Sequence, residues 1–315
     1  MPRMHRDRVS AEKTPAAGAP ETEEKKKKTA PSSGQGKAKR ADRIRLFIQA
    51  AACVLFNGYA AGFTKQTIFK GSLKGVCVPV LNCYSCPGAL GACPIGALQS
   101  ILGAQHKVPF YVLGALTLFG VVLGRAVCGF LCPFGFLQDL LAKIPTPKPK
   151  IPKKIDRPAR FVKYAVLLVL CVGLPVFLTD EFGFAPPFFC KYLCPAGTLE
   201  GGVFHLLFNK SLRALAGGLF GWKLGVMLAI LAACVFIPRF FCRYLCPLGA
   251  FYSLFNRFSF TRMHLDKEKC VDCGKCEQVC PMAVDVRKQI NSAECIRCGK
   301  CRHACPTEAI KKDKR

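Results

Sequence analysis

Four apolar stretches, each followed by a short cysteine–proline motif, constrain the fold of this chain more than any other feature. They lie at residues 44–63, 108–124, 161–178 and 222–238. Each has about the ~17 to 25 residues that a helix needs to cross ~30 Å of hydrocarbon. The sequence therefore predicts an integral membrane, all-α domain over residues 44–262 with four transmembrane helices.

The charge of the connecting segments predicts how these helices are oriented. Residues 125–160 contain eight Lys or Arg and two Asp, whereas residues 179–221 contain three basic and three acidic residues. Because cytoplasmic loops carry an excess of Lys and Arg, residues 125–160 and both termini are expected on the cytoplasmic side. The formal net charge of +27 then reflects membrane topology, and no nucleic-acid partner is expected.

The first segment, residues 1–43, is rich in Lys, Ala, Pro, Ser and Gly and contains a run of four lysines at 25–28. It has no apolar periodicity that could bury surface, and it lacks the apolar core and cleavage site of a secretory signal peptide. We expect a disordered basic cytoplasmic tail. Attraction to anionic lipid is the alternative to a simple solvated arm.

The last segment, residues 263–315, contains the cysteine run C-x2-C-x2-C-x3-C-P twice. In such a pair of runs the fourth cysteine of each binds the other 4Fe-4S cluster. Zinc is the alternative, but zinc ribbons use paired C-x2-C motifs. The sequence predicts a small α+β, dicluster ferredoxin-like domain. Its two ligand sets are Cys270, Cys273, Cys276 and Cys305, and Cys295, Cys298, Cys301 and Cys280.

A shorter motif, C-x3-C-P-x-G, follows the second, third and fourth apolar stretches, and a divergent copy follows the first. Its proline begins a short interfacial helix without loss of a hydrogen bond, and the free N–H groups of the first turn then face the sulfur atoms. The cysteines are Cys83, Cys86 and Cys93 in the first copy, Cys128 and Cys132 in the second, Cys190 and Cys194 in the third, and Cys242 and Cys246 in the fourth.

Topology decides which copies meet, because one motif supplies only half of a cluster's ligands. The second and fourth copies share the cytoplasmic face and are expected to bind one 4Fe-4S cluster. The first and third copies share the outer face and offer five candidates for four positions. We expect one outer cluster with Cys93 as a ligand; a second outer cluster that includes Cys77 is the alternative. Outer disulfides with buried inner thiols would be a purely structural explanation.

The remaining candidates carry weaker signals. Cys53, Cys171 and Cys234 lie alone inside apolar stretches and are expected to pack as small hydrophobes. His106 and His205 could hold a quinol proton or a haem iron, or be interfacial polar residues. The sequence contains no phosphate-binding loop, dinucleotide fingerprint or HExxH, so an ATP- or NAD-driven enzyme is not expected.

At the Cys-Pro motifs and the two tail runs, residues 44–310 resemble the membrane polyferredoxins of the NapH and NosR type. The resemblance implies a multi-pass protein of the bacterial inner membrane, with both termini in the cytoplasm. It also implies electron transfer from the quinone pool or a small reduced carrier to a partner reductase or flavoprotein. If the chain is an enzyme, the resemblance implies a quinol dehydrogenase-like oxidoreductase subunit.

The sequence therefore predicts a membrane iron–sulfur protein with two tail clusters and two more in the membrane domain. Clusters on opposite faces of a ~30 Å core are too far apart for one efficient step, so inward placement or an intervening quinone or other cofactor is expected. The alternative function is a membrane redox sensor or a metal-reducing factor in metallocentre assembly.

Overall fold

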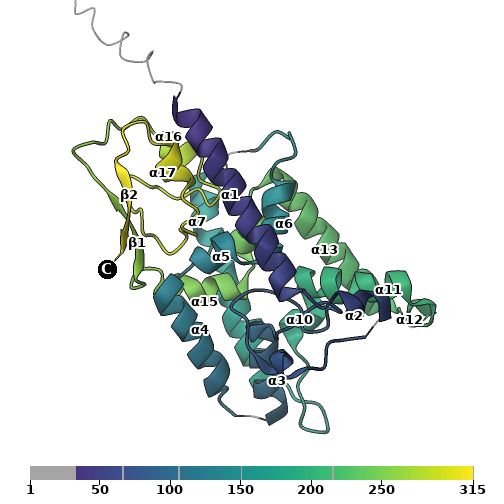
Figure 1. Cartoon of the computed structure of the whole chain (residues 1–315). Helices are drawn as coiled ribbons and strands as arrows, with labels where there is room; N and C mark the ends of the chain where they lie inside the picture. The colour runs from purple at the N-terminus through teal and green to yellow at the C-terminus, as the bar shows by residue number, and fades with distance from the viewer. Residues whose placement is uncertain (1–32, 66, 106, 150, 215, 315) are drawn as a thin grey trace, which may run out of the picture. The chain divides into compact units, whose positions relative to one another are not determined.

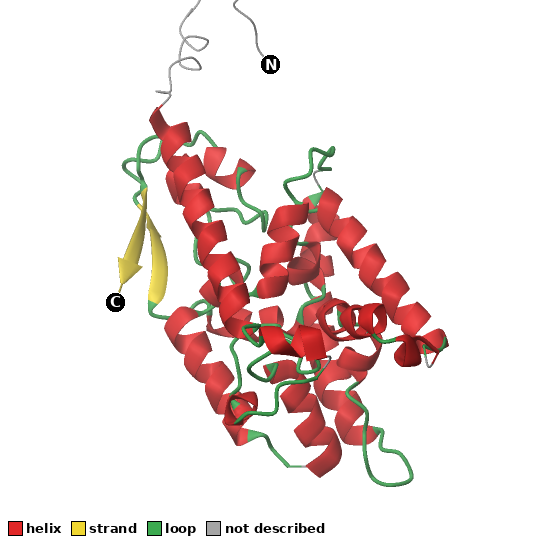
Figure 2. Ribbon diagram, turned by 45° about the vertical axis from the view of Figure 1, so that its right-hand side comes forward, coloured by secondary structure: helices red, strands yellow, loops and turns green. Residues whose placement is uncertain are grey.

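The computed structural model describes residues 33–65, 67–105, 107–149, 151–214 and 216–314. Helices dominate the described chain up to residue 255, and a two-stranded sheet follows in the tail (Figures 1 and 2). The expected disordered tail lies outside the described residues as far as residue 32. From Ser33 onward the structure differs from that expectation, because residues 33–43 form the beginning of a helix that continues to Phe56.

The helical segments of the first half differ in length, from 24 residues in α1 to four in η2. Those that begin at Pro94 and Pro133 start directly after a cysteine, as the Cys-Pro motif predicts. The segments are α1 (Ser33–Phe56), α2 (Ala60–Lys65), η2 (Ser72–Gly75), α3 (Pro94–Gln105), α4 (Phe110–Leu123), α5 (Ala126–Phe130), α6 (Pro133–Leu141) and α7 (Lys153–Ala159).

The second half contains one long helix, α13, among shorter segments and ends in the cysteine-rich tail. The segments are α8 (Val162–Ala165), η3 (Val166–Gly173), α9 (Leu174–Phe177), α10 (Phe188–Tyr192), η4 (Gly197–Val203), α11 (Phe204–Phe208), α12 (Lys210–Ala214), α13 (Gly218–Phe236), α14 (Phe240–Tyr244) and α15 (Pro247–Phe255), then β1 (Thr261–Leu265), α16 (Lys275–Gln278), α17 (Lys300–Ala304) and β2 (Ile310–Lys314). The strands pair antiparallel, with Thr261 opposite Lys314 and Leu265 opposite Ile310.

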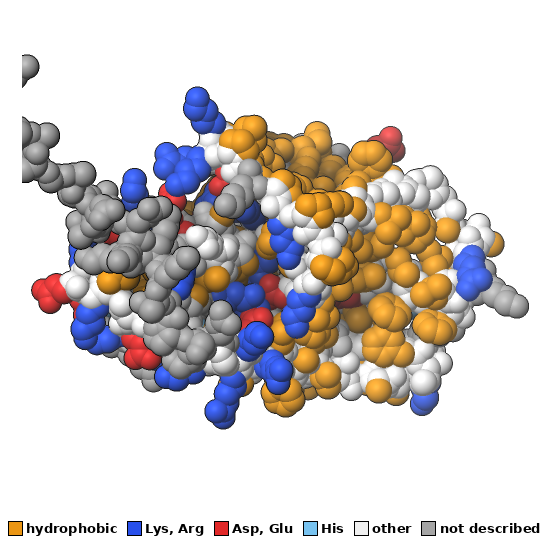
Figure 3. All heavy atoms as spheres, turned by 90° about the horizontal axis from the view of Figure 1, so that it is seen from above, with side chains coloured by type: hydrophobic (Ala, Val, Ile, Leu, Met, Phe, Trp, Pro, Cys, Tyr) orange, Lys and Arg blue, Asp and Glu red, His pale blue; other side chains and the backbone are white. Residues whose placement is uncertain are grey.

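Two helical stretches of the described chain are long and apolar enough to cross a membrane. They are Lys153–Phe177, which joins α7, α8, η3 and α9, and Gly218–Phe236, which is α13. Helix α4 is apolar but shorter. Large apolar side chains are exposed on these helices and on α1, among them Phe47, Leu168 and Leu228. Figure 3 shows apolar side chains gathered over one part of the visible face and most of the visible Lys and Arg over another.

The cysteine-rich C-terminal segment, residues 263–314, is called the tail from here on. It packs directly on the helical domain through buried ion pairs. Glu294 in the tail is paired with Arg125, at 2.9 Å, and with Lys163. Arg297 donates to the carbonyl oxygen of Leu123 at 3.1 Å, and the Asn256 amide donates to the carbonyl oxygen of Cys295 at 2.9 Å. These contacts involve Arg125 just before α5, Lys163 in α8 and Asn256 just after α15. The tail is therefore fixed to several helices.

A second buried cluster of charges joins α1, α6 and the turn before α14. The Asp139 carboxylate is 2.7 Å from Arg45 Nη1 and 2.6 Å from Arg239 Nη2. Although burial alone would raise it, the guanidinium groups of Arg239 and Arg45 hold the pKa of Asp139 below its ordinary value. One carboxylate thus pairs with two buried guanidinium groups, and Arg45 is also paired with Asp42.

We expect Asp139→Leu to lower the free energy of unfolding by about 3–5 kcal/mol, since it leaves the buried guanidinium group of Arg239 without its carboxylate partner. The measurement is a denaturant titration of the purified protein in detergent micelles. Asp42→Asn is the matched control, because Asp42 also pairs with Arg45 but is partly exposed, and we expect it to cost at most about 1 kcal/mol. Equal losses in the two variants would contradict the assigned role of Asp139.

Candidate metal centres

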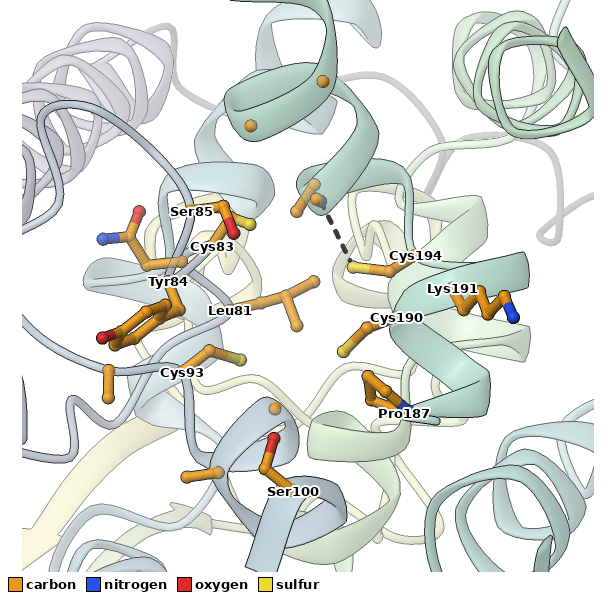
Figure 4. A pocket seen from close by; sticks show the side chains of 18 of the residues that line it. Leu81, Cys83, Tyr84, Ser85, Cys93, Ser100, Pro187, Cys190, Lys191 and Cys194 are labelled. Atoms are coloured by element: carbon orange, nitrogen blue, oxygen red, sulfur yellow. Dashed lines mark hydrogen bonds between the residues drawn. The ribbon is translucent and has the colours of Figure 1, made fainter. Parts of the chain in front are cut away.

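Four cysteines from two distant motif copies line one cavity of about 630 Å³. Cys83 and Cys93 come from the connection between η2 and α3, Cys190 from α10, and Cys194 from the link between α10 and η4. Their sulfur atoms point into the same space (Figure 4). The first and third copies therefore meet, as the topology argument predicts.

The fifth outer candidate, Cys86, does not line this cavity. Its thiol instead lies 3.4 Å from Asn57 Oδ1, whereas Cys83 lies within the lining and close to Gly197 and Gly201. Cys77 is also outside the lining; its N–H donates to the Tyr111 hydroxyl at 3.2 Å. The geometry thus brings Cys83, and neither Cys86 nor Cys77, together with Cys93.

The glycine of each Cys-Pro-x-Gly motif supplies a hydrogen bond to sulfur. The N–H groups of Gly135, Gly197 and Gly249 donate to Cys132, Cys194 and Cys246 at 3.4, 3.3 and 3.3 Å, respectively. Proline at the first helical position directs these free N–H groups toward the cysteine. The motif is therefore a helix N-terminus that holds a thiolate.

The second and fourth copies also meet. Cys128, Cys132, Cys242 and Cys246 are all buried. Burial, and then the neighbouring thiolates of Cys242, Cys128 and Cys132, raises the pKa of Cys246 far above its ordinary value. Such a set needs a cationic partner in order to stay deprotonated, which is what the iron of a cluster provides. The donor set therefore fits a 4Fe-4S cluster, as does the outer cavity.

Two fully buried arginines flank the inner site in a reciprocal arrangement. Arg125 Nη2 donates to the carbonyl oxygen of Cys242 at 3.1 Å, and Arg239 Nη1 donates to the carbonyl oxygen of Cys128 at 2.7 Å. Each arginine precedes the first cysteine of its own motif by three residues. Its guanidinium group donates to the backbone of the first cysteine in the other motif. The sequence analysis missed them; the shared spacing was the available signal.

The outer site has a half-buried carboxylate, that of Glu200, beside its cysteines. Glu200 Oε2 accepts a hydrogen bond from the Cys83 N–H at 2.7 Å. Burial raises the pKa of Glu200 to about 7, and that hydrogen bond opposes the rise. His205 lies at the edge of this region, with Nε2 3.1 Å from the Ser85 carbonyl oxygen, and His106 lies outside the described residues.

In the tail, Cys280 from the first run joins three cysteines of the second. A small cavity is lined by Cys280, Cys295, Cys298 and Cys301. Gly129 in the inner motif adjoins this site: a Cβ at Gly129 would lie 2.5 Å from the Ile296 carbonyl oxygen. The absence of a side chain at Gly129 therefore lets the inner motif and the tail approach closely.

All 21 cysteines lie among the described residues, and none forms a disulfide. Within the described ranges, no three His, Cys, Asp or Glu side chains converge closely enough to hold a single metal ion.

We expect Cys83→Ser to remove about four iron atoms per chain, one cubane cluster, because Cys83 lines the outer cavity. Cys86→Ser, three residues away, is the control and should retain full iron. Iron and acid-labile sulfide, determined on anaerobically purified protein, provide the measurement. The opposite pattern would show that Cys86 is the ligand.

Comparison with known proteins agrees with this geometry. A 4Fe-4S binding domain model matches residues 108–155, 164–214 and 219–266, and a 4Fe-4S dicluster domain model matches residues 262–306. The first model therefore spans the second, third and fourth motif copies, and the second model spans both cysteine runs of the tail. No solved structure matches the chain significantly.

Several proteins are similar in sequence. The uncharacterized proteins MJ0749 and MJ0750 of Methanocaldococcus jannaschii are 33% and 31% identical, over 54% and 57% of this chain and 56% and 68% of their own lengths. The putative electron transport protein YccM of Escherichia coli is 27% identical over 65% of this chain and 57% of its own length. The chain thus spans little more than half of the first of these relatives. It belongs to the family of membrane-associated, ferredoxin-type 4Fe-4S proteins of the NapH and NosR type.

Proposed function

We propose that this protein conducts electrons across a membrane, one at a time, through four 4Fe-4S clusters. The single observation that carries the proposal is the pairing of motif copies, which creates two separate four-cysteine sites. The proposed ligands are Cys83, Cys93, Cys190 and Cys194 for the outer cluster, Cys128, Cys132, Cys242 and Cys246 for the inner cluster, Cys280, Cys295, Cys298 and Cys301 for one tail cluster, and Cys270, Cys273, Cys276 and Cys305 for the other. When bound, each cluster supplies a one-electron redox centre.

The proposed topology has four crossings, by α1, α4, Lys153–Phe177 and α13. Exposed apolar side chains on all four support it, including Phe47 on α1 and Leu118 on α4. The Lys-rich connection between α6 and α7 favours the cytoplasmic side for that loop. The tail packs at the same end, through Lys153, which lies 2.7 Å from Asp285. Both termini would then be cytoplasmic, in a bacterial inner membrane.

The contacts between the inner site and the tail support passage of electrons between them. Arg125 reaches both the Cys242 carbonyl oxygen and Glu294, the residue before Cys295. Gly129 approaches Ile296, between Cys295 and Cys298. These contacts fix the separation of the two proposed clusters, and a fixed short separation is what electron transfer requires.

The outer cavity supports exchange of electrons with a partner on the outer side. It is lined by side chains that also reach the surface, such as Tyr84, which is more than half exposed. The inner cysteines, by contrast, are buried. We propose the quinone pool or a small reduced carrier as the outer-side partner and a reductase or flavoprotein at the tail, in the manner of a quinol dehydrogenase-like subunit.

Reconstitution into vesicles tests the proposal. Dithionite, a membrane-impermeant reductant, is added outside, and the bleaching of ferricyanide trapped inside is followed; each ferricyanide takes one electron. We expect bleaching with the unmodified protein and at least tenfold slower bleaching with Cys242→Ser, which breaks the inner site. Cys53→Ser, in α1 and outside the lining of the outer cavity, should match the unmodified protein. Equal rates with Cys242→Ser, or no bleaching with iron-replete protein, would refute the conduit.

A further inference from the structure

Two buried glutamines occupy equivalent positions in the first two motif copies. Gln99 follows Cys93 by six residues, and Gln138 follows Cys132 by six residues. Each lies in the short helix that its Cys-Pro motif begins, α3 or α6, and each side chain is fully buried. A buried primary amide is costly unless both of its ends are hydrogen-bonded.

At the inner site, Gln138 reaches across to the fourth motif copy. Its Nε2 donates to Cys242 Sγ at 3.0 Å and to the Phe134 carbonyl oxygen at 3.3 Å. Its Oε1 accepts the Cys242 backbone N–H at 3.4 Å. Because a backbone N–H can only donate, the amide oxygen must face it, and the NH2 group is therefore turned toward the sulfur.

At the outer site, Gln99 makes a similar set of contacts with the third motif copy, except that its amide oxygen accepts from the residue before the cysteine. Its Nε2 donates to Cys190 Sγ at 3.5 Å and to the Ile95 carbonyl oxygen at 3.1 Å. Its Oε1 accepts the Phe189 N–H at 2.9 Å. The two sites are built from different helices, so the repeated geometry is two independent observations of one arrangement.

We propose that Gln99 and Gln138 set the reduction potentials of the two membrane clusters, each by donating a hydrogen bond to a ligand sulfur of the opposite motif. This inference rests on the proposed four-cysteine clusters. Reduction adds one electron and makes the cluster and its thiolates more negative, so an N–H donor stabilises the reduced form more than the oxidised form. No bond breaks and no proton leaves the amide. The low dielectric of the buried site strengthens the effect.

A merely structural role would predict something different. A glutamine that only joined two helices would change stability when replaced, but the potential of the neighbouring cluster would stay where it was. The potential is therefore the discriminating measurement. Gln138→Met and Gln99→Met are suitable variants, because methionine has a similar length and cannot donate a hydrogen bond.

The experiment is an EPR-monitored redox titration of the full chain, purified anaerobically in detergent, with dithionite as reductant. The signal that is missing from Cys242→Ser identifies the inner cluster. In Gln138→Met we expect the equilibrium constant for reduction of that cluster to fall about tenfold, a shift of about 59 mV for one electron, with the outer cluster unchanged. Gln99→Met should give the reverse pattern. Ser253→Ala is the control, since Ser253 is buried and bonds Tyr164 and Ala250 but no sulfur; it should shift neither potential.

Unchanged potentials in iron-replete variants would overturn this inference and leave the proposed conduit standing. A wild-type chain that contains only about eight iron atoms instead of about sixteen would overturn the proposed function, and this inference with it. If Gln138→Met loses its iron, the same titration is done with Gln99→Met and with Gln138→Asn, which has a shorter amide side chain. An unchanged cluster potential in both variants contradicts the proposal.

Discussion

This structure depends on one constraint: each buried four-thiol site has to be formed by two motif copies together. A Cys-Pro-x-Gly motif directs one glycine N–H to sulfur, as Gly135 does to Cys132, but it supplies half of a site. The chain therefore has to bring copies that are about 100 residues apart into contact, the first with the third and the second with the fourth. The apolar helical stretches α4, Lys153–Phe177 and α13 each carry the chain from one motif copy to the next, which allows these pairings.

The two sites share this construction but differ in their charged surroundings. Arg125 and Arg239 cross over at the inner site and are neutralised by Glu294 and Asp139, whereas Glu200 lies beside the outer cysteines. The same inner-site arginines also hold the structure together: Arg125 joins the tail to the helical domain, and Arg239 joins the turn before α14 to α6. The same two arginines thus place positive charge beside the inner site and hold the segments of the structure together.

Local sequence patterns predicted the features that depend on spacing: the positions of α4, the Lys153–Phe177 stretch and α13, the Cys-Pro helix starts and the joining of Cys280 to the second tail run. They could not choose Cys83 over Cys86, because that depends on a loop held by long-range contacts such as Lys74 Nζ to the Ala89 carbonyl oxygen. Nor could composition show that α1 begins at Ser33; that helix packs against α17, where Asp42 lies 3.4 Å from Lys300. The partners of Arg125, Arg239 and Gln138 are likewise distant in sequence.

The central claim is that paired motifs create two clusters inside the helical domain in addition to two in the tail. An anomalous difference map collected at the iron absorption edge, from crystals grown anaerobically, tests it most directly. The account predicts four separate iron peaks, one among Cys83, Cys93, Cys190 and Cys194, one among Cys128, Cys132, Cys242 and Cys246, and two in the tail. Peaks in the tail alone, with empty cysteine sites in the helical domain, would contradict it.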